Sequence, residues 1–347
     1  MTEALNVGTA AANPGELGRG GIPIGPDLYG RERELPVMIC RGVEDGPVLW
    51  ISGATHGDEP EGPYSIHLTL AALDPREMRG ALVAVPAMNV EALMDGDRGD
   101  PRDIFTYDMN RIYPGNPHGR ATERVAWAHY QAMKDSCDLH LSVHSGGDHS
   151  FLDTAIFSPE TPECLELAGA MGPEWNLVNT SGIGRGSPTS ILAEAGKGGI
   201  TVELGGWCRT LTTDFHTVGH RLSEAYLNVM RHYEMIPGET EYADEWLRGH
   251  QVVVLAGVPG IWVGEDVELR QPMEKGTVLG RIYNLYGDEI EVARAPEDGQ
   301  IFGLRANPMV KPGDWCCFYA VIDEVRDDLV RQRLSDSKKP LPVDIMS

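Results

Sequence analysis

Polar side chains of the kinds that bind metals stand where a short apolar run of the chain ends. The run Val48 to Ser52 stops at Gly53 and is followed by His56 and Glu59, three residues apart. Imidazole and carboxylate are ligands that zinc accepts, and a strand that stops just before them would hold both at a sheet edge open to substrate. A His-x-x-Glu pair alone is common in polar loops and lacks two ligands of a tetrahedral site, so its meaning depends on the rest of the chain.

A candidate third ligand lies in the segment Cys137 to Gly147. This segment alternates in polarity and ends at two glycines, which predicts a strand. His140 and His144 would face the same side of it but lie about 13 Å apart at roughly 3.3 Å per residue, so one metal ion cannot use both. Ligands in open α/β sheets gather beyond the carboxyl ends of strands, which favours His144 and leaves His140 as a buried or sheet-edge histidine.

A lone carboxylate, Glu203, interrupts the apolar run Gly199 to Gly206, which predicts a short strand before a glycine turn. A carboxylate in so apolar a strand costs free energy unless it has a partner or a task. One reading pairs Glu203 with an arginine. The reading we favour makes it a general base that takes a proton from a water activated by zinc.

Two irregular segments carry cations that could bind an anionic substrate. Asn110 and Arg111 lie in a stretch rich in Pro, Gly and Asn, where a planar guanidinium and an amide could hold a carboxylate; a surface salt bridge is the alternative. The glycine-rich run Gly182 to Ser187 lacks the GKS/T ending of a phosphate-binding loop. Its Arg185 is a second candidate contact to a substrate anion.

The length of 347 residues exceeds one average domain, and we expect three parts. Residues 1–30 are rich in Gly, Ala and Pro without periodicity, which predicts a tail. For residues 31–240 we expect an α/β domain with a mixed sheet flanked by helices. For residues 245–335 we expect a smaller all-β, barrel-like domain that shapes the mouth of the site or packs between subunits. Expected strands are Leu35 to Cys40 at an edge, Val48 to Ser52 and Gly80 to Pro86, and expected helices are Gly62 to Leu73, Thr122 to Lys134 and Thr212 to Tyr233.

Composition limits the partners. The chain has 52 acidic and 29 basic residues, and its net charge of −23 argues against nucleic acid or an anionic membrane surface as a partner. The first residues lack the pattern of a signal peptide, and no stretch approaches 18 apolar residues. The six cysteines are scattered without a CxxC pair, which favours reduced, buried thiols. We therefore expect a cytoplasmic enzyme, and a homo-oligomer remains open.

In chain order, the His56 to Glu59 pair, the Asn110 to Arg111 pair, His144 and Glu203 resemble the succinylglutamate desuccinylase/aspartoacylase family of carboxypeptidase-A-like zinc hydrolases. The resemblance covers roughly residues 35–235 and implies a zinc-carboxypeptidase-like fold with one zinc ion per chain. It implies that His56, Glu59 and His144 bind the zinc, that Asn110 and Arg111 hold the substrate carboxylate, and that Glu203 is the general base.

That family also uses an arginine shortly before the Asn-Arg pair to polarise the scissile carbonyl. Arg102 is our choice for this role, with Arg98 close enough to leave the assignment open. One departure stands out. Family members commonly carry Asp-Leu-His at the third ligand, whereas this chain has Ser142 before Val143 and His144, so another group must orient the ligand.

Within the family, the HGDE-x-EG form at His56 to Gly62 and the MNRIYPG form at Met109 to Gly115 look most like bacterial deacylases related to N-acetyl-diaminobutyrate deacetylase. We therefore expect a zinc-dependent amidohydrolase that acts on a small N-acylated amino acid. A metallocarboxypeptidase acting on peptides and a catalytically inactive metabolite-binding protein are the alternatives. The C-terminal strands are similar to a biotinyl/lipoyl-like barrel but lack its modifiable lysine, so we expect no covalent cofactor.

Overall fold

The computed structural model describes the chain except residues 1–2, 28, 104, 106–107, 208–211 and 327–347. Its centre is four parallel strands, whose apolar runs are buried on both faces, as parallel strands covered by helices require. In spatial order these strands are β6 (Arg79–Val85), β5 (Glu44–Ser52), β7 (Leu139–His144) and β10 (Gly198–Gly205). Because they are parallel, their carboxyl ends meet at one edge of the sheet.

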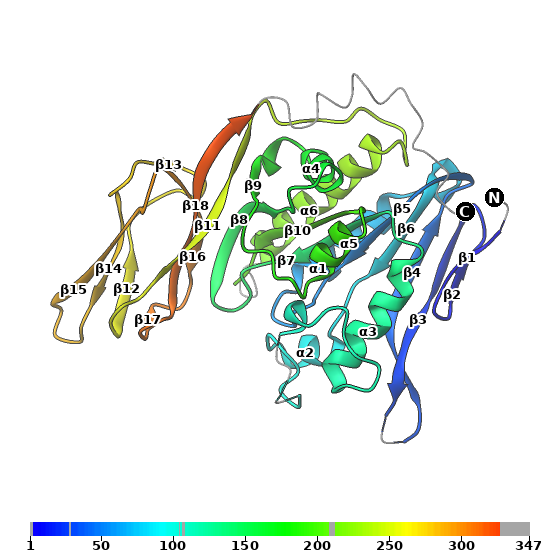
Figure 1. Ribbon diagram of the computed structural model, residues 1–347, viewed down its shortest axis with the longest axis horizontal. Helices are drawn as coiled ribbons and strands as arrows, with labels where there is room; N and C mark the ends of the chain where they lie inside the picture. Colours follow the sequence, from blue (N-terminus) through cyan, green and yellow to red (C-terminus); the bar gives the residue numbers. More distant parts are fainter. Residues whose placement is uncertain (1–2, 28, 104, 106–107, 208–211, 327–347) are drawn as a thin grey trace.

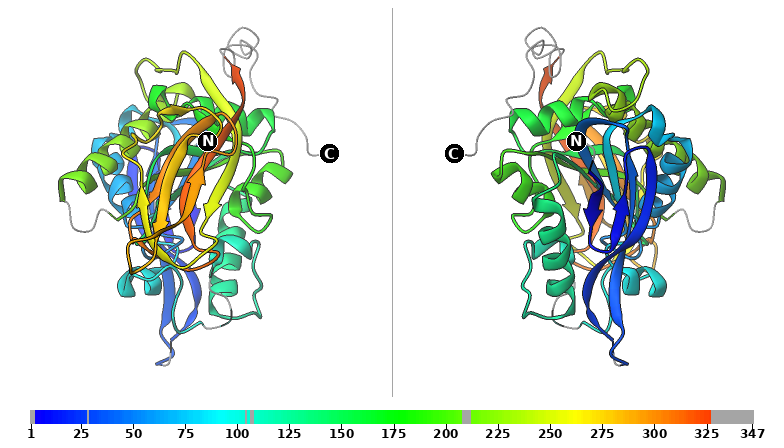
Figure 2. Two further views of the ribbon diagram at one scale, coloured as in Figure 1. Left: turned by 90° about the vertical axis from the view of Figure 1, so that its left-hand side faces the viewer. Right: turned by 90° about the vertical axis from the view of Figure 1, so that its right-hand side faces the viewer.

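Helices cover both faces of this sheet (Figure 1, Figure 2). One apolar core lies between the sheet and α1 (Glu61–Ala72), α4 (Pro162–Gly169) and α6 (Thr212–His232). The other lies against α3 (Ala121–Lys134) and α5 (Pro188–Glu194). Alternation along β5 serves both cores, since Leu49 and Ile51 point to the first and Trp50 to the second. Shorter elements are α2 (Val90–Asp95) and the 3-10 turns η1 (Pro75–Glu77), η2 (Met109–Arg111) and η3 (Pro173–Trp175).

The expected N-terminal tail instead forms three strands, of which the first two pair with each other as a small sheet and the third belongs to the large sheet. Its strands are β1 (Leu5–Val7), β2 (Ala10–Ala12) and β3 (Glu16–Pro26). The long β3 pairs antiparallel with β4 (Glu32–Arg41) along its whole length, so β3 rather than the predicted Leu35 to Cys40 strand forms the edge. Glycine lets the hairpin of β1 and β2 lie directly on β3, because a Cβ at Gly18 would fall 2.1 Å from the carbonyl oxygen of Ala11.

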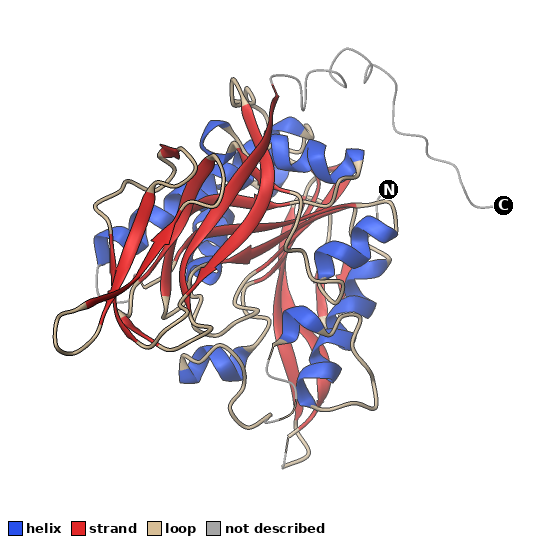
Figure 3. Cartoon of the chain, turned by 60° about the vertical axis from the view of Figure 1, so that its left-hand side comes forward, coloured by secondary structure: helices blue, strands red, loops and turns tan. Residues whose placement is uncertain are grey.

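The last third of the chain extends the same sheet and adds a smaller one (Figure 1, Figure 3). Three strands and a short edge strand join the large sheet: β11 (Trp246–Leu255), β16 (Gly299–Arg305), β18 (Trp315–Arg326) and β13 (Pro272–Met273). The second sheet holds β15 (Glu289–Arg294), β14 (Val278–Tyr283), β12 (Gly260–Gly264) and β17 (Met309–Val310). The expected mixed α/β fold with a strand-rich C-terminal region is confirmed.

One end of the large sheet closes on itself. The strand β8 (Ser150–Phe157) pairs antiparallel with β10, but its other side is shared between β9 (Leu177–Asn179) and β16. Pairings of β9 with β11, β11 with β18 and β18 with β16 complete a closed ring of five strands. The ring combines strands from both sides of residues 240 to 245, where we expected a domain boundary, and that division stays a prediction.

Residues far apart in sequence meet inside this strand ring. One apolar cluster takes Leu152, Ala155, Phe157, Leu177, Phe302, Phe318 and Ala320 from β8, β9, β16 and β18. Among the described residues, no helix combines the length and apolarity needed to cross a membrane. The described cysteines are Cys40, Cys137, Cys164, Cys316 and Cys317, all buried and without disulfides, as expected.

Candidate metal and substrate site

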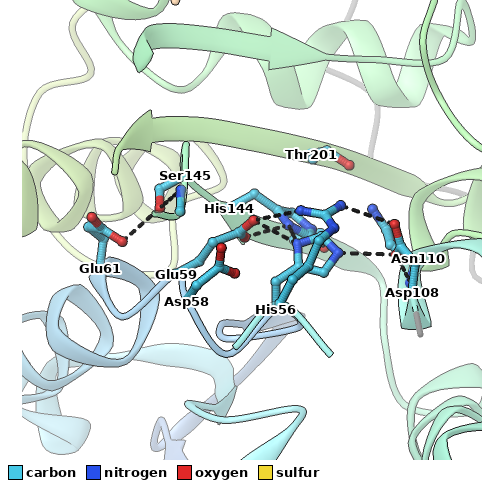
Figure 4. Close-up of polar contacts among 12 residues, drawn as sticks. His56, Asp58, Glu59, Glu61, Asp108, Asn110, His144, Ser145 and Thr201 are labelled. Atoms are coloured by element: carbon cyan, nitrogen blue, oxygen red, sulfur yellow. Dashed lines mark hydrogen bonds and ion pairs between the residues drawn. The ribbon is translucent and has the colours of Figure 1, made fainter. Parts of the chain in front are cut away.

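The carboxyl edge of the parallel strands brings three predicted ligands together (Figure 4). His56 and Glu59 lie in the loop after β5, and His144 is the last residue of the neighbouring strand β7. The Glu59 carboxylate lies 2.7 Å from Nδ1 of His56 and 2.9 Å from Nδ1 of His144, and the two Nδ1 atoms are 3.2 Å apart. All three side chains are buried.

These donors suit a divalent metal ion. Two imidazole nitrogens that face each other at 3.2 Å must share a proton or a cation, and the ionised carboxylate beside them adds negative charge. Burial by itself would raise the pKa of Glu59, but His56 and His144 hold it well below its usual range. Two nitrogens and one oxygen match the donor set of catalytic zinc sites, which keep the fourth position open.

Glu203 lies on the strand beside His144. It occupies β10, in register with His144 across the parallel pair. Its side chain is partly buried, and its Oε2 atom is shielded from solvent without a hydrogen-bond partner among the described residues. Removal from water raises the pKa of Glu203 well above its ordinary value, and the nearby Glu59 adds to the rise. A carboxyl group at this place beside the predicted ligands can serve as a general acid or base.

The structure places Arg98, and not the expected Arg102, beside the metal ligands. Arg98 donates to Asp108 at 3.0 Å and lies 3.5 Å from the Glu59 carboxylate, with 31% of its side chain exposed. Arg102 is 60% exposed and turns outward to Asp100 and Glu91, each at 2.8 Å. Acidic partners on opposite sides of this irregular loop therefore direct the two arginines to different places.

Of the other residues predicted to bind an anion, two line the cavity and one does not. Asn110 and Arg111, in η2, both line the cavity beside the ligands, and Oδ1 of Asn110 is buried without a hydrogen-bond partner among the described residues. The guanidinium of Arg111 donates to the Asn110 carbonyl at 3.0 Å and is otherwise largely exposed. Arg185 is exposed and does not line the cavity, although its neighbours Gly184 and Ser187 do.

The cavity encloses about 250 Å³ and has two unlike walls. One wall carries the three predicted ligands, Glu203 and the cations described above. The other wall is made by the strand ring and the loop that follows β9. Its residues are Leu152, Phe157, Ile183, Gln251, Val253, Phe302, Trp315 and Phe318.

Comparison with known proteins agrees with this geometry. Residues 45–232, more than half of the chain, match the model of the succinylglutamate desuccinylase/aspartoacylase catalytic domain. The chain belongs to this family. It is 27% identical over 313 residues to the N-alpha-acetyl-L-2,4-diaminobutyric acid deacetylase of Halomonas elongata, which covers 85% of this chain and 87% of the relative.

Solved structures of the family share the fold. The product-bound ectoine utilization protein EutE (DoeB) of Ruegeria pomeroyi superposes with a TM-score of 0.75 at 24% identity, covering 88% of this chain and 95% of that one. A succinylglutamate desuccinylase of Silicibacter sp. TM1040 gives a TM-score of 0.76 at 20% identity, covering 92% of this chain and all of the other. At these identities the likeness establishes the fold alone.

In this member of the desuccinylase/aspartoacylase family, two outer groups orient the histidine ligands. Asp108 lies 3.1 Å from Nε2 of His56, and the hydroxyl of Ser142 lies 3.1 Å from Nε2 of His144. Each contact fixes which ring nitrogen faces the metal position. Ser142 thus occupies the place of the family's usual aspartate with a neutral partner. Sequence reasoning missed Asp108, although it directly precedes the segment that was singled out for Asn110.

A second carboxylate whose role was not predicted from the sequence joins the ends of two neighbouring strands. Glu61, at the start of α1, accepts a hydrogen bond from the Ser145 hydroxyl and another from the backbone of Gly206, both at 2.8 Å. These residues follow the last residues of β7 and β10, so Glu61 ties the strand of His144 to the strand of Glu203. Its signal in the sequence was its place in the HGDE-x-EG run, two residues after Glu59.

Proposed function

We propose that this chain is a zinc-dependent hydrolase that cleaves the amide bond of a small N-acyl amino acid. The convergence of His56, Glu59 and His144 with Glu203 on the adjacent strand carries the proposal. Family membership supports it, because the activities for which the family is named remove acyl groups from amino acids. The Halomonas relative is named for one such substrate, Nα-acetyl-2,4-diaminobutyric acid, which makes that compound a first candidate.

The metal ligands would hold one zinc ion, which lowers the pKa of a coordinated water and polarises a carbonyl when it is bound. Glu203 takes the proton of the attacking water and later gives it to the departing amine. Arg98 lies against the same ligands and donates to the oxygen of the carbonyl as negative charge develops there.

The substrate carboxylate is assigned to the cationic segment. Arg111 offers a largely exposed guanidinium to the cavity, and Asn110 lines it with a side-chain amide whose NH2 group can donate to a carboxylate. A planar guanidinium binds a carboxylate through two parallel hydrogen bonds, which fixes orientation as well as charge. This anchor sets the amide carbonyl of a small amino acid beside the metal position.

The size of the cavity favours a metabolite over a peptide. Its volume of about 250 Å³ lies just below the range typical of drug-sized ligands. The strand ring contributes a whole wall of the cavity, where a peptidase would leave a groove for the rest of the chain. These features support a deacylase over the metallocarboxypeptidase alternative.

The test combines metal content with acid release. Protein purified without chelator should carry close to one zinc per chain and release acid from members of a panel of N-acetyl, N-succinyl and N-formyl amino acids. His144→Ala should lose the metal. Glu203→Gln should keep it but lose about 10² to 10⁴ in kcat. Full activity of Glu203→Gln would remove Glu203 from the mechanism, and a zinc-loaded protein that hydrolyses nothing in the panel would instead be a binding protein.

A further inference from the structure

Four aromatic side chains form a continuous surface on the strand-ring side of the cavity. Phe157 of β8, Phe302 of β16, and Phe318 and Trp315 of β18 all line it; we call them the aromatic wall. Ring centroids are 6.2 Å apart for Phe157 and Phe302, 6.0 Å for Phe302 and Phe318, and 4.7 Å for Phe318 and Trp315. These spacings are typical of packed aromatic pairs, so the wall is one preformed surface.

The aromatic wall begins next to the strand that carries the base. Phe157 is directly opposite Thr201 in the antiparallel pairing of β8 with β10, so both side chains point to the same face. Glu203 lies two residues further along β10, on that face as well. Neighbouring strands are about 4.8 Å apart, so a substrate held at the metal position reaches the wall within a few atoms.

The lack of charged side chains on the strand-ring side of the cavity limits which substituents of a substrate it can bind. The strand ring contributes residues to the cavity lining from β8, β11, β16 and β18, and none of these lining residues is charged; Gln251 is polar and Trp315 has an indole N–H. His149, which directly precedes β8, also lines the cavity. A charged substituent of a substrate would lose its water there without gaining a partner, which is unfavourable. An apolar substituent gains free energy from leaving water.

A narrow loop joins the wall to the carboxylate anchor. A Cβ added at Gly182 would lie 3.2 Å from the Phe157 ring, and one added at Gly184 would lie 3.4 Å from the side chain of Arg111. The two glycines therefore hold the loop against both sites at once. A substrate whose carboxylate binds Arg111 has its neighbouring substituents within reach of the aromatic wall.

We infer that the preferred substrates carry an extended apolar group, and that the aromatic wall binds it. The inference rests on the proposed function and narrows it to N-acyl amino acids with an apolar acyl chain or an apolar amino-acid side chain. Both sources present the same chemistry to the wall, so the experiment must distinguish them.

Two substrate series make the distinction. The first lengthens the acyl chain on glycine from acetyl to butanoyl and hexanoyl, and the second keeps acetyl and enlarges the amino acid from glycine to alanine, leucine and phenylalanine. In the series whose group meets the wall, kcat/KM should rise about threefold for each methylene added, until the cavity is full. The series that rises identifies the source.

Variants assign the effect to the wall. Trp315→Ala should lower kcat/KM at least tenfold for the longest member of the responding series and less than twofold for the shortest, and Trp315→Leu should restore part of the loss. Tyr286→Ala is the matched control, because Tyr286 is an aromatic residue in the turn between β14 and β15 that is 93% exposed and does not line the cavity. Equal losses in both variants would overturn the assignment.

Failure of the inference differs from failure of the proposed function. A zinc-loaded protein that hydrolyses short and long members equally well retains the deacylase activity but refutes the apolar preference. If no member releases acid, the deacylase proposal fails, and calorimetric titration with the same compounds decides the role of the wall. Tighter binding with chain length and a negative heat-capacity change would support it, and binding independent of chain length would overturn it.

Discussion

The two walls of the cavity come from different parts of the sheet and use opposite kinds of side chain. The polar wall gathers at the carboxyl ends of β5, β7 and β10, where charged groups are removed from water. Glu59, Asp108 and Arg98 of this wall are paired with one another or with His56, because an uncompensated buried charge is costly. The aromatic wall needs no such network and is stabilised by packing alone.

This difference separates catalysis from selection. A change in the polar wall should alter the turnover of every substrate by a similar factor, because it acts on the amide and the carboxylate that all substrates share. A change in the aromatic wall should alter the ranking of substrates and leave the smallest ones nearly unaffected. The predictions below test whether the two walls are as independent as their construction implies.

After Glu203, the largest effect on turnover is expected from Arg98. Arg98→Ala should lower kcat by about 10² to 10³ for all members of both substrate series, because one donor to the developing oxyanion is lost. Steady-state kinetics on zinc-loaded protein measures this. Arg102→Ala is the matched control and should stay within about twofold of the parent, since Arg102 faces Asp100 and Glu91 outside the cavity. A comparable loss in both variants, or a changed chain-length dependence in Arg98→Ala, would break the comparison.

Arg111 should govern affinity for the substrate carboxylate. Arg111→Ala should raise KM by roughly 10- to 100-fold for N-acyl amino acids, as expected when a charged hydrogen-bond pair worth about 1.5–3 kcal/mol is lost. The corresponding carboxamides should be affected much less. Arg185→Ala serves as the control because Arg185 is exposed and does not line the cavity. Equal changes for acids and amides would show that Arg111 does not bind the carboxylate.

The outer partners of the ligands should set metal affinity. Asp108→Asn should weaken zinc binding by about 10- to 100-fold, because the carboxylate that orients His56 is neutralised, and Ser142→Ala should fall near the lower end of that range. Competition with a chromophoric chelator measures the affinity. Asp95→Asn, at an exposed position at the end of α2, controls for the loss of a negative charge. Zinc affinities unchanged in Asp108→Asn would mean that His56 is oriented by other contacts.

The polar wall could be predicted from the sequence where its signals are local. An apolar run that ends at a glycine with a ligand-type residue close to it marks the ends of β5, β7 and β10, and parallel pairing then brings those ends together. The choice between Arg98 and Arg102 has no such signal. Both lie in one irregular loop, and each takes its direction from acidic partners that spacing along the chain does not reveal.

The aromatic wall depends on contacts that leave no local pattern. The strand ring closes through pairing of Leu152 with Gly303, residues about 150 positions apart, so the predicted C-terminal strands gave no hint that β8 would join them. The edge strand β3 was missed for a related reason. Its glycines and prolines weaken every strand signal, yet an edge position tolerates proline and the overlying hairpin requires glycine.

The smallest effect concerns a buried histidine outside the cavity. His129 of α3 is fully buried, with Nδ1 bound to the Tyr113 hydroxyl at 3.0 Å, and burial lowers its pKa from 6.5 to about 3. Below pH 6.5 the unfolded chain therefore binds a proton that the folded chain excludes. The free energy of unfolding should fall with pH from about 6.5 to about 3, by about 1.4 kcal/mol per pH unit for this residue.

Urea unfolding in the presence of chelator, at pH 5.5 and pH 7, isolates this contribution from loss of the metal. His129→Gln should reduce the fall in stability by about 1 kcal/mol relative to the parent. His118→Gln, at an exposed position, should leave the fall unchanged. The aromatic wall contains no ionisable group, so acid sensitivity of this kind belongs to the half of the sheet beneath the metal ligands. If the free energy of unfolding of His129→Gln falls between pH 7 and pH 5.5 as much as that of the parent, the folded protein binds a proton at His129. The core that supports the polar wall would then be more accessible to water than its packing indicates.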